Sequence, residues 1–193
     1  MAAHKLAIVL GSSASALEEF DGAQRYLSAN GFEPRVVCVN GAVRISPVKP
    51  YAFCTVFTPA ESAKRFLEGV DLEGVRMFSR RAERGAFNAV RSKWRGDSGL
   101  YAVQIALQEL GFAGVILAGC PIDASGGTLC PHSEMAEPTK ADRFKPAWVK
   151  ALPEIRERTR SMSGWTRDLL GAPCQHWIAQ IAAQTPPRHR SRS

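Results

Sequence analysis

The sequence lacks the features that would place the protein in a membrane or in an oxidising compartment. Its longest apolar stretch, around Val115–Ala118, is far too short to span a bilayer. No basic segment followed by an apolar run opens the chain, so we expect no secretory signal. The five cysteines are odd in number and include no C-x-x-C pair, and Cys38, Cys54 and Cys120 lie in or beside apolar runs. We therefore expect a cytoplasmic protein with reduced cysteines and no membrane span.

Several motifs that would define a function are also missing. The chain contains neither G-x-G-x-x-G nor G-x-x-x-x-G-K-[ST], and it shows no helix-turn-helix or zinc module. Cys120, Cys130 and His132 match no standard zinc-ligand spacing. We therefore expect no structural metal and no sequence-reading DNA-binding module.

The composition is that of a globular chain. With 193 residues, of which 45% are hydrophobic and 22% charged, the chain is long enough to bury a sizeable core, and we expect one domain over residues 1–184. The net charge of +7 favours anionic partners. Part of that charge lies in the tail "TPPRHRSRS" (residues 185–193), which predicts a disordered solubilising end. A nucleic-acid contact by this tail is the alternative, although no motif supports it.

Apolar runs alternate along the chain between strand-like and helix-like patterns. The most apolar strand-like runs are rich in Val, Ile and Leu and do not alternate with polar residues, which is typical of a parallel sheet covered on both faces. Residues 81–96 are basic and fit neither pattern. The sequence predicts an α/β, Rossmann-like three-layer fold with a mostly parallel sheet of about five or six strands. The expected strands are His4–Leu10, Pro34–Asn40, Tyr51–Pro59, Gly74–Arg80, Phe112–Gly119 and Arg158–Gly164, and the expected helices are Leu17–Asn30, Pro59–Gly69, Ser98–Leu110, Arg143–Glu157 interrupted at Pro153, Gly164–Gly171 and Cys174–Gln184.

In open parallel sheets, ligands bind beyond the carboxyl ends of the strands. "VLGSSASAL" places Gly11 and three serines between the first strand and the first helix, where backbone N–H groups and hydroxyls can hold a phosphate. The other interpretation is a turn and a helix cap, in which Ser15 and Glu18 form a capping box. The two interpretations are compatible.

Five further polar residues lie after strands, at the start of a helix or in the long loop. Asn40 ends the second strand and either caps a turn or contacts a base or ribose. "GDSGLYAV" offers Asp97 or Ser98 as an N-cap or as a second ligand contact. Asp123 ends the fifth strand as a structural acceptor or as a contact to metal or sugar. His132, in the long loop that follows, is either a general base or a solvated side chain.

Three stretches resemble a known family when they are taken together. They are "VLGSSASAL", "CVNGAV" and "GDSGLYAVQIALQELGFAGVILAGCPID", which cover about a quarter of the chain in the expected order. In this they are similar to the sialyltransferase-like Rossmann superfamily. That group includes the bacterial CMP-sialic acid sialyltransferases, the archaeal-type hydroxymethylpterin diphosphokinases and short phage or prophage members. The long third stretch is the most specific of the three.

The resemblance implies a nucleotide-binding transferase that acts on a CMP-sugar or on a nucleoside triphosphate. It assigns His132 and Asp123 as catalytic residues, His132 as a base in glycosyl transfer and Asp123 as a Mg²⁺ contact in diphosphate transfer. Mg²⁺ is expected only with a triphosphate substrate. The nucleotide-binding residues that it implies are Gly11, Ser12, Ser13, Asn40, Ser98 and Gly99, and the serine-rich first turn adds Ser15 to this set.

Departures from the family pattern favour a second hypothesis. The first turn reads Ser-Ser-Ala-Ser where the family has Gly-Pro-Ser, and residues 120–142 contain no tyrosine for the leaving phosphate. The protein would then be a non-catalytic phage-type accessory or assembly factor with a basic partner-binding surface. Basic residues that line the crevice would favour the ligand hypothesis, and an outer basic patch would favour the partner hypothesis. The residues that decide this are Arg80, Arg81, Arg84, Lys93 and Arg95.

Overall fold

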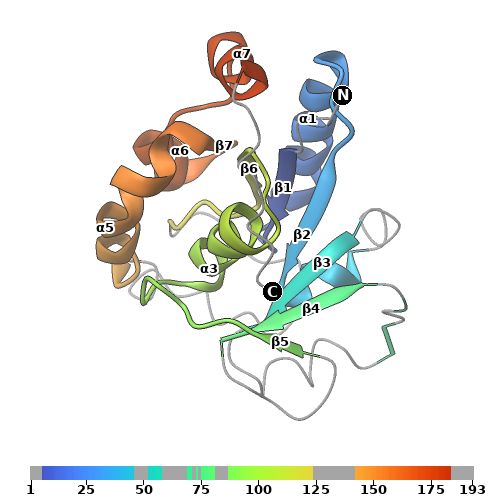
Figure 1. Ribbon diagram of the computed structural model, residues 1–193, viewed down its shortest axis with the longest axis vertical. Helices are drawn as coiled ribbons and strands as arrows, with labels where there is room; N and C mark the ends of the chain where they lie inside the picture. The colour runs from blue at the N-terminus through green and yellow to red at the C-terminus, as the bar shows by residue number, and fades with distance from the viewer. Residues whose placement is uncertain are drawn as a thin grey trace, which may run out of the picture.

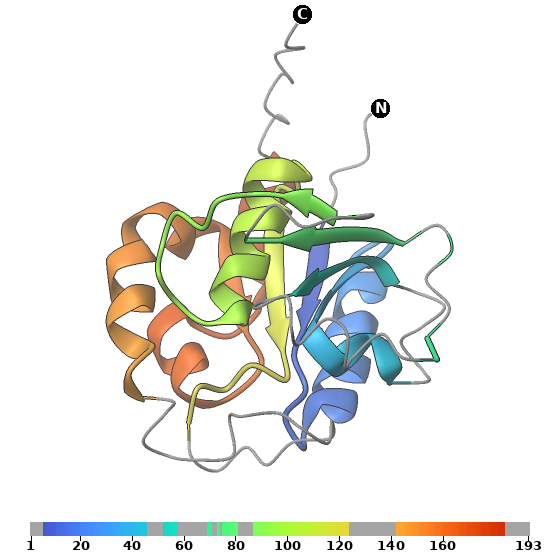
Figure 2. The ribbon, with the colours of Figure 1, turned by 90° about the horizontal axis from the view of Figure 1, so that it is seen from below.

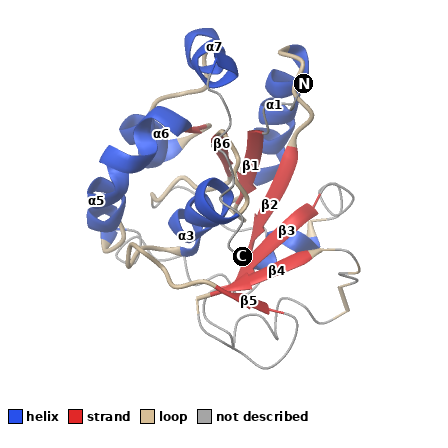
Figure 3. Ribbon diagram, in the orientation of Figure 1, coloured by secondary structure: helices blue, strands red, loops and turns tan. Residues whose placement is uncertain are grey.

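A computed structural model of the chain describes residues 6–45, 52–57, 69–70, 73, 75–80, 87–123 and 142–183. Within these residues a sheet of seven parallel strands runs in the order β5-β4-β3-β2-β1-β6-β7 (Figures 1 and 3). Helices cover both faces of this sheet, which confirms the Rossmann-like α/β fold. The strands are β1 Leu6–Leu10, β2 Arg35–Val39, β3 Ala52–Phe57, β4 Arg76–Ser79, β5 Phe87–Ala89, β6 Gly114–Ala118 and β7 Thr159–Ser161.

The strand count exceeds the expected five or six. Four strands of five or six residues form the centre, while β4, β5 and β7 have only three or four residues each. The additional strand is β5, within the basic stretch that carried no apolar pattern. This edge strand is held by its backbone pairing with β4, where Phe78 lies opposite Asn88. A three-residue edge strand needs no apolar alternation, and the sequence pattern therefore did not predict it.

The helices pack in two layers on the two faces of the sheet. One core cluster joins one face of β1 and β6 to α3 and α5, and the other joins the opposite face to α1 and α7. Alternate residues of β1 divide between the two clusters, with Ala7 and Val9 in the first and Leu6, Ile8 and Leu10 in the second. The helices are α1 Ala16–Ala29, α3 Ser98–Gln104, α5 Lys145–Ile155, α6 Gly164–Leu170 and α7 Gln175–Ala183, with 3-10 turns η1 Asn40–Arg44 and η5 Arg156–Arg158 and a π-helical segment η3 Ile105–Glu109.

The helix α5 continues through Pro153 to Ile155 rather than breaking there. Pro153 lies close to the end of the helix, so the missing proline N–H affects only the last turn. The helix expected over Pro59–Gly69 and the tail 185–193 lie outside the described residues. Among the described helices, none is both long and apolar enough to cross a membrane.

Candidate functional site

The turns after β1 and β6 meet at the point where the strand order reverses. From β1 the chain adds β2 to β5 on one side, and β6 and β7 lie on the other side (Figure 1). Gly11 N–H donates to the carbonyl of Ala118 at 2.8 Å, and Ser13 N–H donates to that of Gly119 at 3.3 Å. A Cβ on Gly11 would lie 2.1 Å from the Gly119 carbonyl oxygen. Only glycine therefore allows this close approach at the switch point.

The turn after β1 brings its serines together. Ser13 is buried, and its Oγ lies 3.1 Å from Ser15 Oγ, while Ser12 is half-buried. Ser15 occupies the N-cap position of α1 but makes no side-chain capping bond, because its hydroxyl donates to Glu19 instead. The predicted capping box between Ser15 and Glu18 was therefore wrong.

Glu19 is a site residue that the sequence analysis missed. Its carboxylate is buried and accepts hydrogen bonds from Gly119 N at 2.8 Å, from Ser163 Oγ at 2.6 Å and from Ser15 Oγ. It therefore ties together the turns that follow β1, β6 and β7. The signal lay in the helical spacing, because α1 buries Ala16, Glu19, Phe20, Ala23 and Leu27, and an acid stands at one position of that buried face.

Asn40 and Ser98 are brought together from distant parts of the chain. Asn40 follows β2 directly, and its Nδ2 donates to Ser98 Oγ at 3.2 Å across 58 residues. Its φ of 49° lies in the left-handed region, and so does that of Ile122, at 51°. Among the described residues, no other non-glycine residue has a positive φ. Both strained residues lie at the carboxyl edge, after β2 and β6, and such strain concentrates at functional sites.

Asp97 is the N-cap of α3, which decides between the two predicted candidates. Its carboxylate accepts from Leu100 N at 3.1 Å, from Gly99 N at 3.3 Å and from Trp148 Nε1 at 2.8 Å. Burial raises the pKa of this carboxyl, and the hydrogen bonds and the nearby Arg80 guanidinium act in the opposite direction. Asp97 is thus a structural acceptor at the mouth of α3.

Arg80 shapes the backbone that leads into α3. It follows β4 at the carboxyl edge, and its Nη2 donates to the carbonyls of Gly96 at 2.8 Å and Asp97 at 2.6 Å. Its guanidinium lies 5.1 Å from the centre of the Tyr101 ring. Arg80 therefore belongs to the carboxyl edge, as the ligand hypothesis requires. Lys93 and Arg95 are exposed. The other two basic residues expected to distinguish the ligand hypothesis from the partner hypothesis, Arg81 and Arg84, lie outside the described residues.

Cys120 lies between the turn that follows β1 and the first turn of helix α3. A Cβ on Gly11 would lie 2.7 Å from its Sγ, and a Cβ on Gly99 would lie 3.5 Å away. The thiol is buried, and that burial raises its pKa well above 9.0, with the Asp97 and Glu19 charges acting in the same direction. The Cys120 side chain therefore lies between Gly11 and Gly99, two of the seven predicted nucleotide-binding residues.

Of the two predicted catalytic residues, Asp123 lies in the described part of the chain. Asp123 follows β6 and is half-buried, and a Cβ on Gly164 at the start of α6 would lie 2.4 Å from its Oδ2. His132 lies outside the described residues. Within the described part of the chain, no cluster of three or more His, Cys, Asp or Glu side chains is arranged to hold a metal ion.

A pocket of about 400 Å³ opens at the same edge, between α1 and the turn after β7. Its walls combine two carboxylates and two hydroxyls with the apolar side chain of Met162. The carboxylates are those of Glu18 and Glu19, and the hydroxyls are those of Ser15 and Ser163. Ser15 is the one predicted site residue among them. The lining residues are Ser15, Glu18, Glu19, Gly22, Arg25, Met162 and Ser163.

Comparison with known proteins leaves the site geometry as the basis for any functional conclusion. No protein-family model, curated protein or solved structure matches the chain.

Proposed function

We propose that the protein is a nucleotide-binding transferase that takes a nucleotide sugar, such as a CMP-sugar, or a nucleoside triphosphate. The ligand would lie along the carboxyl edge, with its phosphates at the Gly11–Ser15 turn and its nucleoside at Asn40 and Ser98. The observation that carries this proposal is the left-handed Asn40, which meets Ser98 from 58 residues away.

The strain at Asn40 supports a ligand role because a turn alone does not require it. A left-handed backbone costs a non-glycine residue roughly 1–2 kcal/mol, less for Asn. Glycine follows at position 41 and would adopt such a conformation without strain. An asparagine amide both donates and accepts hydrogen bonds, as a base edge or a ribose hydroxyl requires. The conformation therefore favours an amide that is held toward a ligand.

The two transfer reactions make different use of the remaining residues. In glycosyl transfer, His132 would take the proton of the acceptor hydroxyl while its oxygen bonds to the sugar carbon and the bond to CMP breaks. In diphosphate transfer, Asp123 would help to hold Mg²⁺ beside the phosphates. Asp123 fits this second role in residue type and in its place after β6.

A thermal-shift screen against CMP, CTP, CMP-sialic acid, ATP, GTP and UDP-sugars, with and without Mg²⁺, tests the proposal. A ligand at one hundred times its Kd adds about 2.7 kcal/mol to the free energy of unfolding, which raises the Tm by several degrees. A shift with cytidine nucleotides alone supports glycosyl transfer, and a Mg²⁺-dependent shift with ATP or GTP supports diphosphate transfer. The absence of a shift with every nucleotide would contradict the proposal.

One observation favours the second hypothesis, a non-catalytic partner-binding protein. Arg91, Lys93 and Arg95 are all exposed on the segment that leads from β5 to α3. If the protein binds a polyanion but none of the nucleotides in the screen, this hypothesis is favoured.

A further inference from the structure

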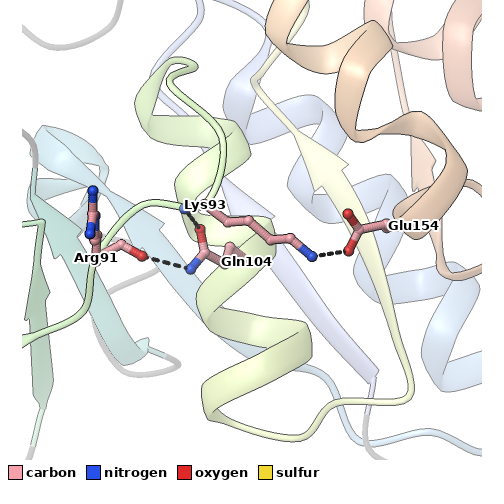
Figure 4. Close-up of polar contacts among 4 residues, drawn as sticks. All are labelled: Arg91, Lys93, Gln104 and Glu154. Carbon is pink, nitrogen blue, oxygen red and sulfur yellow. Dashed lines mark hydrogen bonds and ion pairs between the residues drawn. The ribbon is translucent and has the colours of Figure 1, made fainter.

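Residues 90–97, here called the basic strap, connect β5 to α3 along a path that α3 itself fixes. Tyr101 Oη donates to the carbonyl of Val90 at 2.8 Å. The buried Gln104 side chain donates to the carbonyl of Arg91 at 3.0 Å and accepts from the N–H of Lys93 at 2.8 Å (Figure 4). The one amide side chain of Gln104 thus holds the backbone of the strap at two residues.

The far end of the basic strap is held as firmly as its start. Arg80 donates to the carbonyls of Gly96 and Asp97, and Ser92 Oγ donates to the carbonyl of Trp94. Figure 2 shows the strap curving past α3 to reach the N-terminal end of that helix. Because its backbone is ordered by these contacts, binding a partner would require little further ordering.

Side chains of the basic strap alternate between two sides. Arg91, Lys93 and Arg95 are exposed, whereas Trp94 is only 4% exposed and Ser92 is half-buried. The sequence "RSKWR" therefore presents three cations and no apolar side chain to solvent. The alternation holds although the strap bends at Lys93 and Trp94 and turns tightly where Gly96 N–H donates to the carbonyl of Trp94 at 2.8 Å.

One acid opposes this charge. Lys93 Nζ forms an ion pair with Glu154 Oε2 on α5, and both side chains are about half exposed, at 49% and 45% (Figure 4). Such exposed pairs are weak and are screened by salt. Among the described residues, Arg91 and Arg95 take part in none of the ion pairs found, so the strap keeps two exposed cations beside the paired Lys93.

We propose that the basic strap binds the phosphate backbone of double-stranded nucleic acid without reading its bases. Guanidinium groups match phosphate geometry, and nucleic-acid interfaces are more polar and more positive than protein–protein interfaces. A protein partner would call for apolar side chains at the centre of the surface, and the strap exposes none. The buried Trp94 has no free face for unpaired bases, which favours a duplex over a single strand.

Fluorescence anisotropy with a fluorescein-labelled, mixed-sequence DNA duplex tests this inference over a range of KCl concentrations. The double variant Arg91→Gln with Arg95→Gln is expected to bind about tenfold more weakly and to lower the slope of log K against log [KCl] by about 2, since each phosphate contact contributes about 0.9. Glu154→Gln is expected to strengthen binding, because it frees Lys93 from its acidic partner.

The matched control removes two exposed arginines elsewhere, through Arg35→Gln with Arg167→Gln on β2 and α6. It lowers the net charge by the same amount and is expected to leave affinity and slope unchanged. Equal losses in both double variants would show that only the net charge matters and would overturn the proposal. Failure of the unaltered protein to bind the duplex at low salt, or tighter binding of single-stranded DNA or polyglutamate, would also overturn it. This test requires no nucleotide, so its outcome is separate from that of the proposed transferase function.

Discussion

Glu19 Oε2 accepts a hydrogen bond from the N–H of Gly119 at 2.8 Å, although the two residues lie 100 positions apart in the chain. The same carboxylate accepts from Ser15 and Ser163. A single acidic side chain on α1 therefore fixes the turns after three strands. These turns form the edge at which we place the ligand.

Glu19→Ala is expected to destabilise the protein by roughly 2–4 kcal/mol, because it leaves the buried Gly119 N–H and two hydroxyls without their acceptor. Urea unfolding measures this loss. The adjacent and exposed Glu18 provides the control, since Glu18→Ala is expected to change the free energy of unfolding by less than about 0.5 kcal/mol. Similar losses of unfolding free energy in the two variants would contradict the conclusion that Glu19 holds the three turns together.

Gly11→Ala is expected to destabilise the protein by about 3 kcal/mol or more, because the new Cβ meets the rigid Gly119 carbonyl. Gly22→Ala is the comparison, since its Cβ meets only the flexible Cε of Met162 at 3.1 Å. There the helix propensity of alanine offsets the contact, by up to about 1 kcal/mol. Thermal unfolding measures the stability of the two variants. A Gly11→Ala protein as stable as the Gly22→Ala protein would show that the turns after β1 and β6 are not in close contact.

Asn40→Gly is expected to abolish the thermal shift given by the best nucleotide of the screen while the protein stays folded. Glycine relieves the left-handed strain but loses more backbone entropy on folding, and the two effects nearly cancel, to within about 1 kcal/mol. Asn88→Ala, at an exposed asparagine of β5, serves as the control. A full ligand shift in the Asn40→Gly protein would remove Asn40 from the binding site.

The raised pKa of Asp97 makes stability depend on pH in a defined direction. Because the folded state holds the proton more tightly than the unfolded state, whose pKa is 3.8, this residue stabilises the fold most below that pH. Its contribution falls as the pH rises from 3.8 to the folded pKa. Asp97→Asn keeps an oxygen for Leu100 N–H and Trp148 Nε1 but cannot ionise.

The difference in unfolding free energy between the Asp97→Asn protein and the unaltered protein is therefore expected to shift in favour of the variant as the pH rises through that window. Urea titrations at a series of pH values measure this difference. The opposite trend would mean that the carboxylate is stabilised, rather than destabilised, by its surroundings.

Among the three cysteines whose burial the structure describes, labelling separates the two buried thiols from the exposed one. Cys120 is buried and its raised pKa leaves little thiolate, and Cys38 is also buried, whereas Cys174 is exposed. Iodoacetamide at mildly alkaline pH is expected to label Cys174 in the folded protein, and Cys120 and Cys38 only after denaturation. Peptide mass spectrometry distinguishes the sites. Rapid labelling of Cys120 in the folded protein would contradict the burial of its thiol between Gly11 and Gly99.

The sequence by itself determined the class of fold and the candidate edge. Uninterrupted apolar runs such as β1 and β6 can be satisfied only inside a parallel sheet, and polar turns directly after them must collect at one edge. For the same reason, the position of Asn40 at this edge could be anticipated from local patterns, whereas its hydrogen bond to Ser98 could not.

Only the tertiary structure decided what those residues contact. Ser15 had a local partner available in Glu18, yet its hydroxyl bonds Glu19, which long-range bonds hold toward the ends of β6 and β7. Likewise, the basic stretch gained its strand β5 and its fixed strap from β4 and α3 rather than from its own pattern. Hydrogen bonds between distant segments carry no periodicity in the sequence, and these choices therefore appeared only once the chain was folded.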